Sequence, residues 1–221
     1  MGNLLDQNIV GQIKDIFAKL SQPVEILFFG AENCDYCGDT LQLLREVTAI
    51  DEKLSLSIYD LQKDADAARK FNVDKAPGIV VAAKSGEELV NYGIQYSGIP
   101  SGHEFSTLIN DILMVSSRDS GLSEQTREFL RKLEKPVHMQ VFVTPSCPYC
   151  PQAVLLAHQM SMENPAMIRA EGVEATEFPE LAQRFHVSGV PQTTINAGAA
   201  TVVGAVPEKQ LLSELMRVLA N

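Results

Sequence analysis

Long uncharged apolar stretches are absent from the sequence. No window reaches the roughly 18 residues that a membrane-spanning helix needs. The opening stretch "MGNLLDQNIVGQIKDIFAKL" also lacks the basic start and continuous apolar core of an export signal, because Lys and Asp interrupt an apolar stripe with helical spacing. We therefore expect no membrane span and a cytoplasmic protein.

Basic residues are scarce as well. Lys and Arg number 18 against 28 Asp and Glu, which gives a formal net charge of −10. Nucleic acids and anionic lipids both require clustered Lys and Arg, so the charge argues against either as a partner. Apolar residues make up 45% of the chain and charged residues 21%, a composition typical of a globular protein and not of a disordered one.

Cysteine is rare, but its placement is regular. The four cysteines form two CxxC pairs, Cys34 with Cys37 and Cys147 with Cys150. Without an export signal, four cysteines in 221 residues do not indicate a secreted disulfide scaffold. The pairs indicate either metal binding or redox chemistry.

The two pairs belong to an internal repeat. "PVEILFFGAENCDYC" aligns with "PVHMQVFVTPSCPYC", and further along "KFNVDKAPGIVV" aligns with "RFHVSGVPQTTI". The first alignment superimposes the cysteine pairs, and the second superimposes Pro77 on Pro191. The sequence therefore predicts two units, 1–118 and 119–221, which meet in the polar segment "SSRDSGLS".

Both units are expected to hold the same elements in the same order. In the first unit we expect helices at 4–20, 35–49, 64–71 and 103–116, and strands at 24–30, 54–60, 78–83 and 88–93. In the second unit we expect helices at 123–134, 148–160, 178–185 and 207–219, and strands at 137–143, 166–172, 192–196 and 200–204. This order predicts an α/β fold, a tandem repeat in which each unit is a mixed four-stranded sheet flanked by helices.

Each CxxC pair falls at a strand-to-helix turn, near the carboxyl edge of the predicted sheet. A cysteine at the first turn of a helix faces free backbone N–H groups, which favour its thiolate and lower its pKa. Cys34 and Cys147 are therefore the candidate nucleophiles. Three residues later the helix returns to the same face, so Cys37 and Cys150 are the more buried candidate resolving thiols. A mixed disulfide with a substrate would form on the first thiol and be displaced by the second.

A zinc-binding scaffold protein is the alternative interpretation of the cysteines. The long separation of the pairs and their equivalence in the repeat place them in separate cores, which argues against one four-cysteine site. Pro148 after Cys147 also favours the redox interpretation, because proline at a first helical position would place that cysteine at the helix cap. We expect no metal and no cofactor.

The two predicted sites differ in charge. Glu32 and Asp35 flank Cys34, and nearby negative charge disfavours a thiolate. Cys147 is followed by Pro148 instead. We predict that Cys147 has the lower pKa and reacts faster, and that Glu32, Asp35 and Pro148 tune this difference.

Pro77 and Pro191 stand at the starts of predicted strands, where proline is common for purely structural reasons. The repeat favours a second interpretation, a cis X-Pro turn that faces the cysteines and presents backbone to an extended substrate. Lys75 would offset the acidic charge near the first site if it points at the first cysteine pair. The residues expected to contact the substrate are Ala76, Pro77, Val190, Pro191, Tyr36 and Tyr149.

The CxxC pair at a helix start and the distal proline before a hairpin, repeated in both units, resemble the thioredoxin superfamily. "CPYC" at 147–150 resembles the glutaredoxin motif. The whole chain, including "YSGIPSGHEF" and "FVTPSCPYCPQAV", is similar to the two-unit glutaredoxin-like protein disulfide oxidoreductases. The resemblance implies two thioredoxin-fold units in one continuous sheet, with cis peptide bonds at Pro77 and Pro191. It also implies an enzyme that reduces, forms or isomerises protein disulfides and is itself reduced by a thioredoxin-reductase-like flavoprotein.

Two features depart from the families that the chain resembles. Thioredoxins carry a buried acid six residues before the first cysteine, where this chain has Phe28 and Val141, so the group that deprotonates the resolving thiol is open. No Lys shortly precedes either pair, which disfavours glutathione as the main substrate. A dedicated electron donor to a peroxiredoxin is a further alternative, although one copy of that tandem module normally lacks its cysteines.

Overall fold

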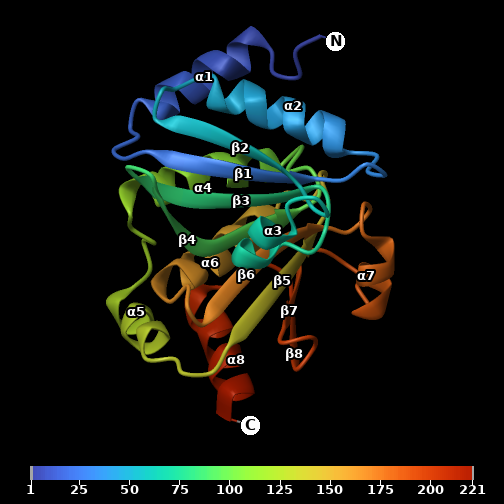
Figure 1. Ribbon diagram of the computed structural model, residues 1–221. Helices are drawn as coiled ribbons and strands as arrows, with labels where there is room; N and C mark the ends of the chain where they lie inside the picture. The colour runs from blue at the N-terminus through green and yellow to red at the C-terminus, as the bar shows by residue number, and fades with distance from the viewer. Residues whose placement is uncertain (1, 221) are drawn as a thin grey trace.

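The computed structural model describes residues 2–220, which form two successive copies of one set of elements (Figure 1). The elements of the first copy are α1 (Gln7–Phe17), β1 (Val24–Gly30), α2 (Cys37–Thr48), β2 (Leu54–Asp60), α3 (Ala65–Phe71), β3 (Gly78–Ser85), β4 (Glu88–Ser97) and α4 (Glu104–Ser117). Those of the second copy are α5 (Glu124–Arg131), β5 (Val137–Val143), α6 (Cys150–Glu163), β6 (Ile168–Glu174), α7 (Pro179–Arg184), β7 (Gln192–Ile195), β8 (Ala200–Val203) and α8 (Glu208–Ala220). No helix in this part of the chain is long and apolar enough to cross a membrane.

The strands join in one mixed sheet with the order β2-β1-β3-β4-β6-β5-β7-β8. Within each copy the first two strands are parallel, and the hairpin strands are antiparallel to their neighbours. β4 pairs with β6 in parallel, from Ile94 opposite Ala170 to Ser97 opposite Val173, and this pairing joins the two halves. The predicted tandem repeat of mixed four-stranded units is confirmed, while the boundary after residue 118 stays a prediction.

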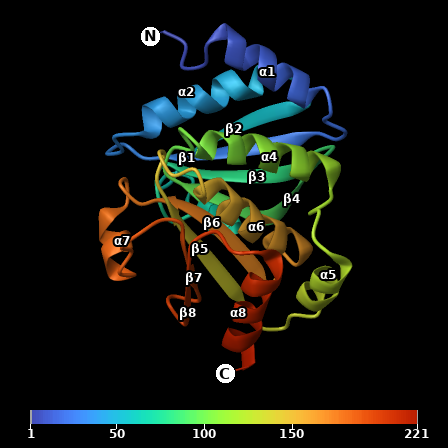
Figure 2. The same ribbon diagram turned by 180° about the vertical axis from the view of Figure 1, so that it is seen from behind.

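Helices cover the two faces of the sheet unequally. One apolar core lies beneath α1, α2, α4, α6 and α8 and draws on both copies, with Ile26 from β1 and Met139 from β5 both fully buried. Figure 2 shows α4 and α6 side by side across this face. On the opposite face, a small core of Leu27 and Phe29 packs against Phe71 of α3. The two copies therefore share their main core, and the opposite face is covered less completely.

β4 is longer than predicted, because it continues past residue 93 to Ser97. Gly93 has a φ of +72°, and a Cβ at this position would lie 2.7 Å from the Ile168 carbonyl oxygen of the neighbouring copy. Glycine permits both this backbone conformation and the close approach of β6. The extra strand residues are stabilised by pairing with β6, a partner that local sequence does not identify.

Two predictions about helices need correction. α2 and α6 begin at Cys37 and Cys150, two residues later than predicted, so the first cysteine of each pair lies in the preceding turn. Pro148 is consequently not the first helical residue, and Cys147 is not the helix cap. α7 spans Pro179–Arg184, one residue shorter at each end than the predicted helix, and His186 beyond it has a φ of +52°.

Candidate active site

Both cysteine pairs lie at the same edge of the sheet. β1 and β4 are both antiparallel to β3, and β4, β6 and β5 are parallel, so β1 and β5 run in the same direction. The turns that follow β1 and β5 hold the pairs and therefore lie at the shared carboxyl edge. β1 and β5 are four positions apart in the sheet, which corresponds to roughly 19 Å at about 4.8 Å per strand. The pairs form two separate sites and do not converge in one four-cysteine cluster.

In the first site, Cys34 and Cys37 form a disulfide with their Cα atoms 5.4 Å apart. Cys34 lies in the turn after β1, and the Cys37 N–H donates to its carbonyl oxygen at 3.4 Å. Both cysteines are partly buried, and Tyr36 between them is 46% exposed. The first disulfide is therefore accessible from the edge of the sheet.

In the second site, Cys147 and Cys150 form a disulfide with a Cα separation of 5.5 Å. Cys147 is 8% exposed and Cys150 is fully buried, whereas Tyr149 is 68% exposed. The second site is thus the deeper of the two. Its second cysteine is more buried than its first, as expected from the sequence.

Each cysteine pair lies beside the free N-terminal end of a helix. Tyr36 and Tyr149 are the N-cap residues of α2 and α6, and neither side chain caps its helix with a hydrogen bond. The first N–H groups of both helices therefore point toward the turn that carries the first cysteine. This end of a helix stabilises negative charge, so the geometry favours a thiolate there although the helices begin later than predicted.

The peptide bonds Ala76–Pro77 and Val190–Pro191 are both cis, as the resemblance implied. At the second site, the Cys147 Sγ lies 3.7 Å from the Val190 carbonyl oxygen. The residue before the proline therefore borders the reactive sulfur. A backbone edge in this position suits pairing with an extended peptide, and the substrate-contact role of these residues stays a prediction.

Charged side chains surround the first site unevenly. Glu32 and Asp35 are exposed beside the first cysteine pair. Lys75 does not offset them, because its Nζ lies 2.9 Å from Glu171 Oε1 and also pairs with Asp74 Oδ1. The expected compensation by Lys75 is therefore wrong, since a carboxylate of the second unit takes its charge.

A buried carboxyl group that sequence reasoning missed lies next to the second site. Glu104, the first residue of α4, is 3% exposed and lines a small cavity together with Val143 at the end of β5. The preceding His103 donates its N–H at 2.9 Å to the Pro145 carbonyl oxygen, in the loop that carries Cys147. The last helix of the first unit thus places an acid beside the end of β5 and the loop that follows it.

Burial sets the proton affinity of Glu104. Loss of solvent raises its pKa to about 7 and the charge of Asp111 adds to the increase, while Thr107 and His158 act in the opposite direction. A carboxyl group that titrates near neutral pH is suited to accept a proton from a thiol. Local sequence carries little signal of this role, because Glu in a first helical turn is normally a solvent-exposed complement to the helix dipole.

His158, for which the sequence alone indicates no special role, belongs to a buried polar network. Its Nδ1 lies 2.7 Å from Asp111 Oδ2, and both side chains are fully buried. Tyr96 donates its hydroxyl to the same carboxylate oxygen, and His158 Nε2 lies 3.1 Å from the Gln95 carbonyl oxygen. The network connects β4 and α4 of the first unit to α6, the helix that begins at Cys150.

Comparison with known proteins places this geometry in context. The family model described as "Thioredoxin domain" matches residues 137–217. A protein disulfide oxidoreductase from Aeropyrum pernix has a similar structure, with 30% identity, a TM-score of 0.89, and coverage of 99% of this chain and 96% of that chain. The alkylhydroperoxide reductase AhpF from Enterococcus faecalis gives 26% identity and a TM-score of 0.86, over 96% of this chain and 99% of the compared chain.

A curated relative shows the same unit within a longer protein. The alkyl hydroperoxide reductase AhpF of Pseudomonas aeruginosa is 26% identical over 214 residues, which cover 96% of this chain. The present chain spans only 37% of the length of that relative. The likeness therefore concerns the two-unit module and not the remainder of the longer protein.

Proposed function

The chain belongs to the protein disulfide oxidoreductases of the thioredoxin superfamily, and from this premise we propose that its two sites reduce, form or isomerise disulfide bonds of protein substrates. It is a thiol–disulfide exchange enzyme. The observation that carries the proposal is the repeated arrangement of a CxxC disulfide at a strand-to-helix turn with a cis-proline turn in each unit. Both arrangements open at one edge of the sheet.

The exchange reaction proceeds in two displacement steps. In the dithiol form, the Cys147 thiolate attacks one sulfur of a substrate disulfide, forms a mixed disulfide and releases the other sulfur as a thiolate. Cys150 then attacks Cys147, which reforms the enzyme disulfide and releases the second substrate thiol. The substrate gains two electrons and two protons in all. Cys34 and Cys37 carry out the same steps in the first unit, and substrate oxidation is the reverse sequence.

Glu104 is the proton acceptor that we assign to the second site. Cys150 is fully buried, so its thiol needs a nearby base before it can attack the mixed disulfide. Glu104 lies beside the loop of this site and titrates near neutral pH because it is buried. Glu104 would do the work of the buried strand acid of thioredoxins, whose positions in this chain hold Phe28 and Val141.

The cis-proline turns bind the substrate in this proposal. An extended polypeptide pairs with the backbone of Ala76 or Val190, and Tyr36 or Tyr149 covers it from the exposed side of the site. Main-chain pairing tolerates many side chains, which suits an enzyme that acts on several proteins. The short contact between Cys147 and the Val190 carbonyl oxygen supports this placement at the second site.

A thioredoxin-reductase-like flavoprotein is the electron donor that we propose. A CxxC disulfide needs two electrons after each round of substrate reduction, so an external reductant must supply them. The relative from Pseudomonas aeruginosa carries the same module in a longer reductase, which supports a reductase as the partner. The proposal places the protein in the cytoplasm, because reducing systems there convert disulfides back to thiols after each round.

Insulin reduction driven by dithiothreitol tests the proposed function. We expect the wild type to accelerate precipitation of the insulin B chain, and the variant with both Cys34→Ser and Cys147→Ser to lose the acceleration. Because Cys147 lacks the acidic sequence neighbours that flank Cys34, the single variant Cys147→Ser should lose more activity than Cys34→Ser. A wild-type rate no higher than that of dithiothreitol alone would refute general protein disulfide exchange.

Electron donation to a peroxiredoxin is a second candidate function. It is favoured by the match of 96% of the chain to the alkyl hydroperoxide reductase AhpF. If this function is the main one, the reduced chain will support hydrogen peroxide consumption by a peroxiredoxin much faster than it reduces insulin. If insulin reduction is faster, the general oxidoreductase is favoured.

A further inference from the structure

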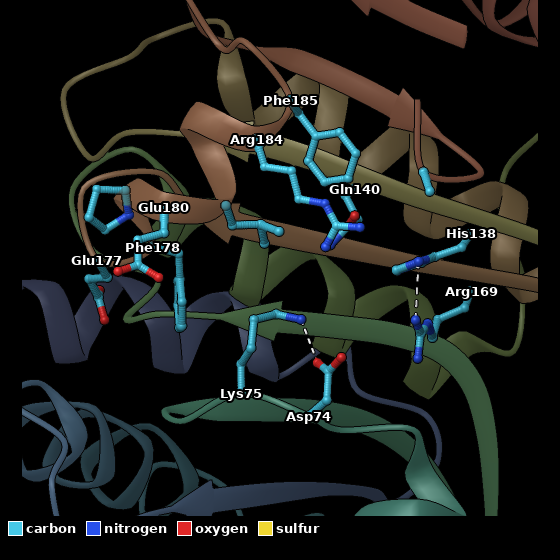
Figure 3. A pocket seen from close by; sticks show the side chains of 13 residues that line it. Asp74, Lys75, His138, Gln140, Arg169, Glu177, Phe178, Glu180, Arg184 and Phe185 are labelled. Atoms are coloured by element: carbon cyan, nitrogen blue, oxygen red, sulfur yellow. Dashed lines mark hydrogen bonds and ion pairs between the residues drawn. The ribbon is translucent and has the colours of Figure 1, made fainter. Parts of the chain in front are cut away.

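An open groove crosses the sheet face that carries α3 and α7 (Figure 3). Its volume is about 780 Å³, and both units line it. Asp74 and Lys75 of the first unit lie at one wall, immediately before the cis-proline turn, and α7 of the second unit forms the opposite wall. The start of α7 is fixed at the carboxyl edge, since the Phe178 N–H donates to the carbonyl of Glu174, the last residue of β6. This inter-unit groove therefore begins at the edge that holds the cysteines.

The far end of the inter-unit groove contains a guanidinium group held by a backbone carbonyl and an imidazole ring. Arg169 donates to the Asn72 carbonyl oxygen at 2.9 Å and lies 3.1 Å from His138 Nδ1. These contacts hold Arg169 in place from both units without neutralising its charge. His138 is the second residue of β5, so this end is distant from the carboxyl edge.

A second guanidinium group projects into the inter-unit groove from α7. Arg184 lies 5.6 Å from the centre of the Phe185 ring, and Figure 3 shows it directed toward the floor of the groove. Within residues 2–220, neither Arg184 nor Arg169 has a carboxylate within ion-pair distance. Lys75, by contrast, is neutralised by Asp74 and Glu171. Two uncompensated cations facing one cavity are unusual in a chain with a net charge of −10.

The rest of the inter-unit groove combines an apolar wall and acidic residues with the polar side chains of His138 and Gln140 on the floor and the neutralised Lys75. Phe178, Leu181 and Phe185 supply apolar surface along α7, while Glu177 and Glu180 lie near the carboxyl edge. An occupant that matches this surface has apolar side chains along its length and a negative charge at the end away from the cysteines.

We propose that the inter-unit groove binds an extended segment of the substrate polypeptide and selects acidic residues in it. The inference rests on the proposed function and specifies its substrates. From His138 to Val143 the floor strand spans roughly 17 Å, which an extended segment of about five residues covers. The selected carboxylate of the substrate therefore lies about five residues from the substrate cysteine that the enzyme attacks. At that distance Arg169 and Arg184 form charge-assisted hydrogen bonds with the carboxylate. A small anion would occupy only a fraction of the volume and would leave the apolar wall unused.

Fluorescence anisotropy with two cysteine-free probes tests the proposal without any redox chemistry. The probes are fluorescein-labelled peptides of about ten residues that alternate apolar residues with either Glu or Gln. We expect the oxidised wild type to bind the Glu peptide at least about tenfold more tightly than the Gln peptide, a difference that increased salt reduces. Arg184→Gln, which changes an exposed side chain that lies over the Phe185 ring, should remove most of the difference, and Arg169→Gln should do the same.

The matched control is Lys14→Gln with Arg45→Gln, which removes two exposed positive charges outside the groove. It should retain the preference for the Glu peptide. Equal binding of both peptides by the wild type would overturn the proposal, as would equal losses in the control and groove variants. Displacement of the Glu peptide by inorganic phosphate, beyond that by sodium chloride of the same ionic strength, would assign the groove to small anions instead. Failure of the proposed function would appear separately, as absence of insulin reduction.

Discussion

At the scale of single residues, Glu104 makes the two cysteine pairs unequal. It belongs to the first unit in sequence but lies beside the cysteine loop of the second unit in space. The acidic residues beside the first pair in the sequence, Glu32 and Asp35, are exposed. A proton acceptor with a pKa near 7 is therefore assigned to the second pair alone, and the first pair depends on solvent or on its exposed acidic neighbours.

Replacement of Glu104 tests this difference. We expect Glu104→Gln to slow turnover at the second site by about tenfold or more at pH 7, the usual size of a lost general base, with recovery at higher pH where the thiol ionises without help. The measurement is the pH profile of peptide disulfide reduction in a Cys34→Ser background. The same substitution in a Cys147→Ser background is the control and should leave turnover at the first site unchanged. Equal slowing of both sites would show a general structural effect and contradict the assignment.

At the scale of elements, an ion pair connects β6 to the first cis-proline turn. Lys75 and Glu171 are 17% and 4% exposed, and Glu171 also accepts hydrogen bonds from Ser97 and Gln140. Although burial alone raises the pKa of Glu171, His138, Lys75 and Ser97 hold it well below its usual range. The second unit therefore fixes the position of the residue that stands just before Ala76.

Variants that remove the Glu171 charge alone, or the Lys75 and Glu171 charges together, measure the contribution of this ion pair to stability and substrate binding. Glu171→Gln leaves the largely buried Lys75 ammonium group with the exposed Asp74 in place of a buried carboxylate, and we expect a loss of up to about 3 kcal/mol in the free energy of unfolding. Lys75→Met combined with Glu171→Gln should recover much of this loss in urea denaturation. The double variant should still show a raised KM at the first site and an unchanged KM at the second, because the Ala76 turn is no longer held. Equal KM changes at both sites would reject this positioning role.

The sequence predicted elements well wherever local pattern determines them. Strands β1, β2 and β5 have the predicted bounds, because each is a short run rich in apolar residues, alternating with polar ones in β2, between turn residues. The pairing of β4 with β6 and the burial of Glu104 and His158 depend on contacts between residues far apart in sequence. Charged and polar residues on helices normally face solvent, so their periodicity alone gives no sign that another unit covers them.

At the scale of the whole molecule, buried carboxyl groups determine how stability depends on pH. Glu104 and Glu177 both have pKa values raised from 4.5 to about 7 by burial. Between these values the folded chain holds protons that the unfolded chain releases, so the free energy of unfolding falls as pH rises. Glu171 acts in the opposite direction, because its lowered pKa gives stability above pH 4.5 that is lost as pH falls.

We therefore expect maximal stability near about pH 5, with a decline on both sides. Urea denaturation of the oxidised chain across acidic and neutral pH measures this profile. Glu104→Gln should flatten the decline toward neutral pH and contribute up to about 3 kcal/mol of stability at pH 8, since a pKa change of one unit corresponds to about 1.4 kcal/mol. If the free energy of unfolding of the wild type is greatest at neutral pH and Glu104→Gln leaves this profile unchanged, the raised pKa of Glu104 is disproved.

Trapping of mixed disulfides tests most directly whether each unit of the molecule is a working exchange site. Cys37→Ser and Cys150→Ser each remove a resolving thiol and leave the nucleophile in place, so a bound substrate cannot be released by the second displacement. Each variant also carries a serine at the other site's nucleophile: Cys147→Ser is added to Cys37→Ser, and Cys34→Ser is added to Cys150→Ser. After incubation with oxidised insulin, mass spectrometry should find insulin chains attached to Cys34 in the first double variant and to Cys147 in the second. Absence of any adduct on either cysteine, with the proteins folded and reduced beforehand, would contradict thiol–disulfide exchange as the chemistry of this chain.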